Sequence, residues 1–180
     1  MKNISRIFVF ALVAALFFIS NSCDKFDTFE LNVPFPIEVV TQGSANPSVS
    51  TSDYCLNQSE TFRDIVEDIK KVTFVEAAWR TDSVKNITSG TVSVKLEEIG
   101  GAVLFQKTLP GTNPADYKSK PFILSFTETE ITILNNYFNQ YIDNPNRCLR
   151  ATVTATVQTG TAPYYLKGYV DLLVSAETEL

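Results

Sequence analysis

Strict alternation of apolar and polar residues marks the first extended element of the chain. Residues 29–39 are apolar at every odd position, and the positions between them are polar or proline. A period of two is typical of a strand with one buried face. Pro34 and Pro36 lack an N–H group on the same lateral side of this strand, which predicts a sheet edge or a bulge there.

Further strands are indicated by the same alternation later in the chain. It recurs over residues 91–96, 103–109, 149–158 and 166–174, while residues 72–79 are apolar on both faces, as in a central strand. Gly100 and Gly101 suit a hairpin turn, and residues 122–126 form another short apolar run. The stretch 42–53, rich in Ser, Thr, Gly, Asn and Pro, predicts a loop.

Two segments show helical spacing instead. Ser59 suits the N-cap of a helix whose apolar residues recur up to Ile69. Thr127 and Glu130 have the spacing of a capping box, and a second apolar stripe follows them before Asn144-Pro145-Asn146 ends the helix.

This order of elements predicts a mainly β fold. Seven or eight strands with two short helices in connections lack the regular βαβ alternation of a parallel sheet. We expect an antiparallel β-sandwich, immunoglobulin-like or a related Greek key, formed by residues 29–176 as a single domain. A closed barrel around a ligand is the alternative. Residues 177–180 are expected to be a frayed tail.

The first 22 residues have a different character. Lys2 and Arg6 precede an apolar run of 13 residues, 7–19, which spans about 20 Å and is too short for a bilayer core of about 30 Å. Ser20-Asn21-Ser22 then leads to Cys23. This arrangement resembles the lipobox signal of bacterial lipoproteins, in the looser, serine-containing form of the Bacteroidota.

The resemblance implies that residues 1–22 are a cleaved signal peptide and that Cys23 is acylated. Residues 23–28 would be a lipidated tether, and the membrane would be a partner through the lipid anchor. Two or three acyl chains hold a protein on a bilayer stably. An ordinary secretory signal that leaves Cys23 as a thiol is the alternative.

The membrane of destination is indicated by the residues after Cys23. Asp24 and Asp27 resemble the acidic export signals of surface lipoproteins in the Bacteroidota, although an aspartate after the cysteine resembles inner-membrane retention in other lineages. We expect export and lipid anchoring to the outer membrane.

Two cysteines remain after Cys23. Thiols of exported proteins usually pair in their oxidising compartment, so Cys55 and Cys148 predict a disulfide bond. Two separate buried thiols are the alternative.

Composition excludes several kinds of catalytic and binding site. The chain has no histidine, which excludes Ser-His and Cys-His nucleophile pairs and histidine zinc sites. No cofactor motif or metal site is indicated. The net charge is −5, and removal of the leader with Lys2 and Arg6 makes the remainder more acidic, so nucleic acid is not an expected partner.

Candidate binding residues are aromatic. Trp79, Tyr164 and Tyr165 could stack on a ligand, with Tyr164 and Tyr165 directed to opposite faces of their strand, although most aromatic residues fill the core. Asp82-Ser83-Val84 resembles the bacterial O-glycosylation triplet, which makes Ser83 a candidate site.

The function predicted from these features is that of a membrane-anchored cell-envelope lipoprotein, a non-catalytic binding or interaction module for a glycan or an envelope protein. One alternative is a structural or assembly accessory that pairs through the edge strand at residues 33–39. A carboxylate-based hydrolase is a second alternative, since paired acids can hydrolyse glycosides without histidine.

Overall fold

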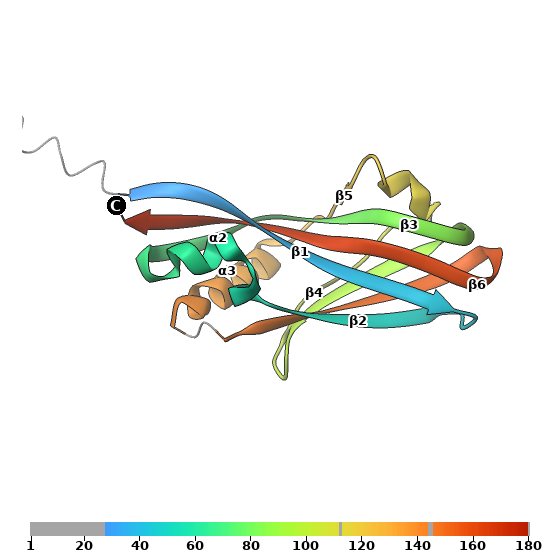
Figure 1. The fold of residues 1–180 in the computed structure, drawn as a ribbon, viewed down its shortest axis with the longest axis horizontal. Coiled ribbons are helices and arrows are strands. Elements are labelled where there is room, and N and C mark those ends of the chain that lie inside the picture. Colours follow the sequence, from blue (N-terminus) through green and yellow to red (C-terminus); the bar gives the residue numbers. More distant parts are fainter. Residues whose placement is uncertain (1–27, 112, 144–145, 180) are drawn as a thin grey trace, which may run out of the picture.

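The structure, a computed structural model, describes residues 28–111, 113–143 and 146–179 (Figure 1). Its strands are β1 (Thr28–Gly43), β2 (Ser48–Cys55), β3 (Ile69–Glu98), β4 (Val103–Thr108), β5 (Phe122–Ile123) and β6 (Cys148–Glu179). Its helices are α2 (Glu60–Ile65) and α3 (Glu128–Asp143), with 3-10 turns η2 (Leu56–Gln58), η3 (Val66–Asp68) and η4 (Pro114–Tyr117). No described helix has the length and apolar content to cross a membrane.

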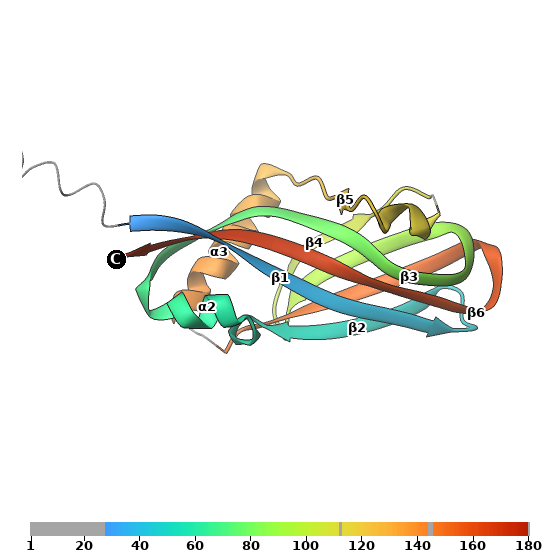
Figure 2. The same cartoon turned by 45° about the horizontal axis from the view of Figure 1, so that its top comes forward.

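Two very long strands form the frame of the fold. β3 and β6 pair antiparallel along nearly their whole length, from Ile69 opposite Thr178 to Glu98 opposite Leu149. Midway the ribbon turns over on itself, and its register shifts repeatedly between Lys85 and Gly90. Figures 1 and 2 show this ribbon running to one end of the domain, bending there and returning as a second layer.

The other strands extend the two layers. β1 pairs with the second half of β6, β2 pairs with the first half of β6, and β4 pairs with the second half of β3. The result is a single antiparallel sheet folded into a sandwich, with its two helices in connections, as the sequence predicts. The sheet is open, since β1 and β4 lie at the two ends of the strand order, and the alternative of a closed barrel is therefore wrong.

β1 occupies the edge position that its prolines predict. It pairs on one side only, with Pro34 opposite Leu173 and Pro36 opposite Asp171. The side chains at odd positions from Val33 to Val39 are buried, which confirms the predicted inward face. Because alternate residues direct their N–H groups to opposite sides, both prolines fall on the side that has no neighbouring strand.

Helices close the open end of the sandwich, opposite the bend (Figure 2). The Phe35 ring contacts Phe62 of α2 edge-on at 5.4 Å and stacks on Phe138 of α3 at 6.0 Å between centroids. The predicted cap of α2 is confirmed, because the Ser59 hydroxyl accepts a hydrogen bond from the Phe62 N–H. One continuous apolar core thus joins both layers and both helices.

Helix α3 also replaces a missing strand beside β3. The side-chain amide of Asn139 accepts from the Val72 N–H at 3.0 Å and donates to the Val72 carbonyl at 2.7 Å. Asn135 accepts from the Phe74 N–H at 2.7 Å. These bonds pair backbone groups that would otherwise be orphaned at this stretch of β3.

Two stretches differ from the sequence prediction. Within the predicted loop 42–53, residues 42–43 end β1 and residues 48–53 lie in β2, whose small polar side chains give no apolar period while its backbone pairs with β6. Residues 177–179, predicted to fray, continue β6 and pair with β1 and β3, and Thr178 is buried. In both cases strand pairing across the sheet decides the local structure, against local composition.

The disulfide between Cys55 and Cys148 is present, as predicted. It joins the end of β2 to the start of β6, where the two residues are also register partners. The bond fixes the second layer of the sandwich next to the end that the helices fill.

Candidate functional site

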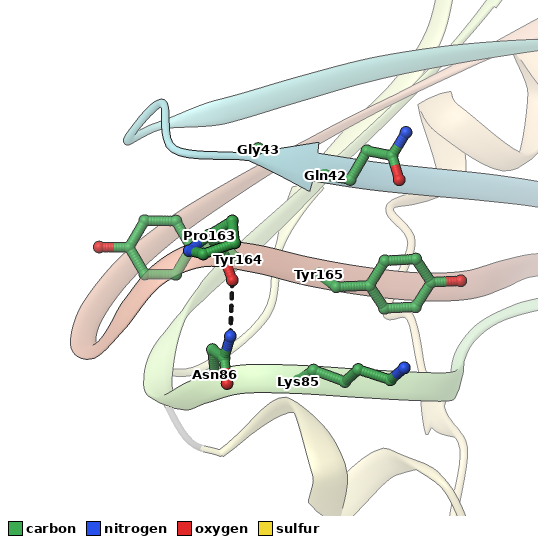
Figure 3. Close-up of a pocket in the computed structure, with 7 residues that line it drawn as sticks. All are labelled: Gln42, Gly43, Lys85, Asn86, Pro163, Tyr164 and Tyr165. Atoms are coloured by element: carbon green, nitrogen blue, oxygen red, sulfur yellow. Dashed lines mark hydrogen bonds between the residues drawn. The ribbon is translucent and has the colours of Figure 1, made fainter.

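An open pocket lies where the folded sheet bends, at the end of the domain opposite the helices (Figure 3). It has a volume of about 540 Å³, within the range of small-ligand sites. We call it the tip pocket; it is lined by Gln42, Gly43, Lys85, Asn86, Pro163, Tyr164 and Tyr165. Three strands supply these residues: β1 at its end, and β3 and β6 at their common bend.

The backbone of the bend is built by residues that fit unusual geometry. Asn86 has a left-handed conformation with φ of 62°, and its side-chain N–H donates to the Pro163 carbonyl at 2.8 Å. This bond ties β3 to β6 across the pocket floor (Figure 3). Gly160 is required opposite, because a Cβ there would overlap the Asn86 carbonyl oxygen.

The two tyrosines of the tip pocket take different positions. Tyr164 is half-buried and packs against the apolar core, whereas Tyr165 is half-buried on the outer face of the sheet, beside Lys85. The Lys85 ammonium lies 5.7 Å from the centroid of the Tyr165 ring. The rings point in different directions, as the predicted alternation requires (Figure 3).

A network of ion pairs covers the same outer face next to the tip pocket. The Glu38 carboxylate accepts hydrogen bonds from the Lys167 ammonium at 3.0 Å and the Tyr169 hydroxyl at 2.8 Å, and these bonds lower the pKa of Glu38. Arg80 forms two hydrogen bonds with Asp171, and its guanidinium lies 4.4 Å from the Tyr169 ring centroid. Hydrogen bonding to Asp171 raises the pKa of Arg80. The charges in this network are therefore compensated.

Lys85 is different from these neighbours. Among the ion pairs of the described residues none includes Lys85, whereas Lys167 faces both Glu38 and Asp82. None of the seven residues of the tip pocket carries a carboxylate. The tip pocket is therefore a local positive site on a chain of net charge −5.

The prediction that Trp79 stacks on a ligand is wrong. Its indole is only 1% exposed and its N–H donates to the Thr81 hydroxyl at 3.1 Å inside the core. The stretch 72–79 is not buried on both faces as predicted, since Val75 is 48% exposed. Trp79 lies on the inward face of β3, among the core side chains, and its ring has no access to a ligand there.

Ser83 lies in β3, opposite Lys167 at an irregularity in the register. It is half-buried on the outer face, two residues before Lys85 of the tip pocket. O-glycosylation of Ser83 stays a prediction.

In the described part of the chain, neither the tip pocket nor three smaller pockets are lined by a pair of acidic residues of the kind that a glycosidase needs. Glu98 is the single carboxylate of one pocket beside the β3–β4 hairpin and of another beside α3, and Asp116 is the single carboxylate of a pocket near β5. Within the described ranges no group of three or more Cys, Asp or Glu side chains suits a metal ion.

The free edge of β1 is a poor surface for strand addition. Pro34 and Pro36 remove two of its outward N–H donors, in the middle of the segment 33–39 that the accessory alternative requires. Prolines in this place are typical of edges protected from pairing with another chain.

Cys23, the leader 1–22 and most of the tether 23–28 lie outside the described residues. The tether ends where β1 begins, at Thr28.

Sequence reasoning identified Tyr164 and Tyr165 but missed Gln42, Lys85 and Asn86. These residues belong to strands far apart in the chain, and only the pairing of Lys85 and Gln42 with Tyr165 brings them together. No local signal in the sequence connects Asn86 to the residues around Pro163.

Comparison with known proteins adds no family. No protein-family model and no curated protein matches the chain. Among solved structures, it is similar to Desmodium yellow mottle tymovirus, with 12% identity, a TM-score of 0.36 and coverage of 85% of this chain and 89% of that chain. A structure of the infectious bursal disease virus Gt strain has 12% identity and a TM-score of 0.32, over 87% of this chain.

This chain spans 34% of the length of that second chain. Because these TM-scores are low, we infer no property of the present chain from those two proteins.

Proposed function

We propose that the protein is a membrane-anchored lipoprotein of the cell envelope, a non-catalytic binding module that presents the tip pocket to its ligand. The observation that carries this proposal is the position of the tip pocket relative to the start of the described chain. Thr28 pairs with Glu179 at one end of the sheet, whereas Gln42 pairs with Tyr165 at the other end. Figure 1 shows the two ends of β1 at opposite ends of the domain.

The length of β1 separates the tip pocket from the start of the described chain. β1 has 16 residues, and a strand rises about 3.3 Å per residue, so the tip pocket lies roughly 50 Å from Thr28. Cys23 precedes Thr28 by only five residues. Acyl chains on Cys23 would hold the helix-filled end near the bilayer and direct the tip pocket away from it.

The anchor is tested by the mass of protein extracted from membranes. We expect native material to begin at Cys23 and to weigh more than the bare polypeptide by its acyl chains. Cys23→Ala should lose these chains, whereas Cys148→Ala should keep them. Native protein that begins upstream of Cys23, or that has the mass of the polypeptide alone, would overturn the proposal.

The orientation is tested by energy transfer in vesicles that contain a lipid-bound acceptor. With Cys23 acylated and the other two cysteines paired, Thr161→Cys supplies a free thiol for a donor dye at the exposed turn of the bend. Glu67→Cys supplies the matched control on η3, at the helix-filled end. We expect strong transfer from position 67 and weak transfer from position 161; equal transfer contradicts the orientation.

A further inference from the structure

We infer that the tip pocket binds a glycan through a sugar residue that carries a carboxylate, a uronic acid. This inference rests on the proposed binding function and specifies the ligand of the same site. It is carried by three features found together: an aromatic ring, one uncompensated cation, and two side-chain amides around an open pocket of about 540 Å³.

The aromatic feature is Tyr165. It lines the tip pocket from the outer face of the sheet and is half-buried, so its ring is held by the strand while part of it stays accessible. An aromatic ring with a polar hydroxyl combines an apolar surface with a hydrogen-bonding group. The flat C–H face of a pyranose ring and its hydroxyl groups match this combination.

Charge distinguishes an acidic sugar from a neutral one. Lys85 is the only charged residue of the lining, and it takes part in none of the ion pairs formed by the described residues, although Lys167 nearby is paired with Glu38. A carboxylate bound beside Lys85 would form the charge-assisted hydrogen bond that the protein itself does not supply. A single cation suits a single negative charge, and phosphate-rich ligands would call for a cluster.

The amides match sugar hydroxyls. Asn86 uses one side-chain N–H on the Pro163 carbonyl, and its second N–H and its oxygen are further hydrogen-bonding groups. Gln42 contributes an amide with the same capacity from β1. A sugar hydroxyl both donates and accepts, so amide groups satisfy it better than a cation or a carboxylate alone.

Calorimetry of the full-length protein in detergent micelles tests this inference with two probes of equal length. The first is an oligogalacturonate, and the second is the same oligosaccharide after reduction of its carboxyl groups to neutral galactose. We expect the acidic probe to bind about tenfold or more tightly than the neutral one, the effect of one hydrogen bond to a charged group. Binding of the acidic probe should weaken as salt is raised.

Variants separate charge from stacking. Lys85→Gln should remove the preference for the acidic probe and leave the weak neutral binding, while Lys85→Arg should restore most of the preference. Tyr165→Ala should weaken both probes by about tenfold or more. Lys118→Gln, which removes an exposed lysine outside the tip pocket, is the matched control and should change neither. Unchanged thermal unfolding shows that each variant is folded.

Equal binding of the two probes by the wild type, a preference for the acidic probe that persists in Lys85→Gln, or failure of both probes to bind overturns the inference. None of these results affects the proposed anchor, which is measured by the mass of the native protein. Loss of the lipid anchor with an intact preference for the acidic probe would instead overturn the proposed function and leave the ligand assignment standing.

Discussion

Gly168 leaves open the space that the indole of Trp79 fills. The two residues lie on adjacent strands, β6 and β3, and a Cβ at position 168 would overlap the six-membered ring of the indole and approach the Arg80 carbonyl. Trp79 is the largest side chain buried in the core. A glycine at position 168, two residues from the register partner of Trp79, is therefore required for the packing of this ring.

Gly168→Ala should destabilise the protein by about 1–3 kcal/mol, because an added methyl group in a close-packed core forces side chains or backbone to move. Urea unfolding followed by the fluorescence of the single tryptophan measures the change. Gly111→Ala is the matched control, since a Cβ there meets only ordinary contacts. Equal stability of the two variants would show that the core accommodates the methyl group.

Asn139→Ala should cost about 1–3 kcal/mol. It removes both bonds to Val72 and leaves a backbone N–H and a carbonyl of β3 without partners. Asn136→Ala on the exposed side of the same helix should change the free energy of unfolding by less than about 0.5 kcal/mol. Hydrogen exchange at Val72 gives an independent measurement: its amide should exchange faster in Asn139→Ala only.

Removal of the disulfide by Cys55→Ala with Cys148→Ala should lower the free energy of unfolding by roughly 4–5 kcal/mol. The bond closes a loop with a sequence separation of 93, and the chain-entropy model gives that magnitude for the gain in freedom of the unfolded chain. Wild-type protein in reductant should fall to the stability of the double variant, and the double variant should not respond to reductant. The prediction is contradicted if reductant leaves the free energy of unfolding of the wild type unchanged.

Acid should weaken the start of α3. The Glu130 carboxylate accepts two hydrogen bonds from the Lys107 ammonium at 2.7 Å, and it also accepts one from the Thr127 N–H. These bonds, chiefly those from Lys107, lower the pKa of Glu130. A carboxyl group with a lowered folded pKa stabilises the fold above its unfolded pKa, about 4.3, and this contribution is lost as the pH falls through the folded value.

Glu130→Gln keeps the hydrogen-bonding shape of the capping box and removes the charge. At pH 7 it should lower the free energy of unfolding by up to about 1 kcal/mol, and the difference from wild type should shrink towards pH 3. Unfolding curves in urea across this range measure it. Glu128→Gln, at an exposed position two residues earlier, is the control, and its difference from wild type should not shrink in this way.

Much of the fold could be predicted because burial of one face of a strand produces an alternation of apolar and polar residues in the local sequence. The alternation before Val39 and the prolines at 34 and 36 correctly indicate an inward face and an edge position. The caps at Ser59 and Thr127 are equally local, since each joins residues three positions apart.

What the sequence does not reveal is long-range pairing. Residues 149–158 and 166–174 alternate as two strands, yet they belong to one strand, β6, that bends with β3. β2 forms because its backbone finds a partner in β6, although its Ser and Thr side chains carry no apolar period. The tip pocket depends on this same pairing, so its aromatic residues could be identified while Lys85 and Asn86 could not.

The first and last strands of the described chain are partners, Thr28 with Glu179. A chain that crosses a membrane amino end first therefore cannot complete its sheet until its final strand has emerged. Until then β1 has no neighbour, and β3 has only β4 and β5. For the export that we propose, this strand order would make closure of the sandwich the last step of folding, after translocation. Its rate would be limited by the slow pairing of segments that are distant in the sequence.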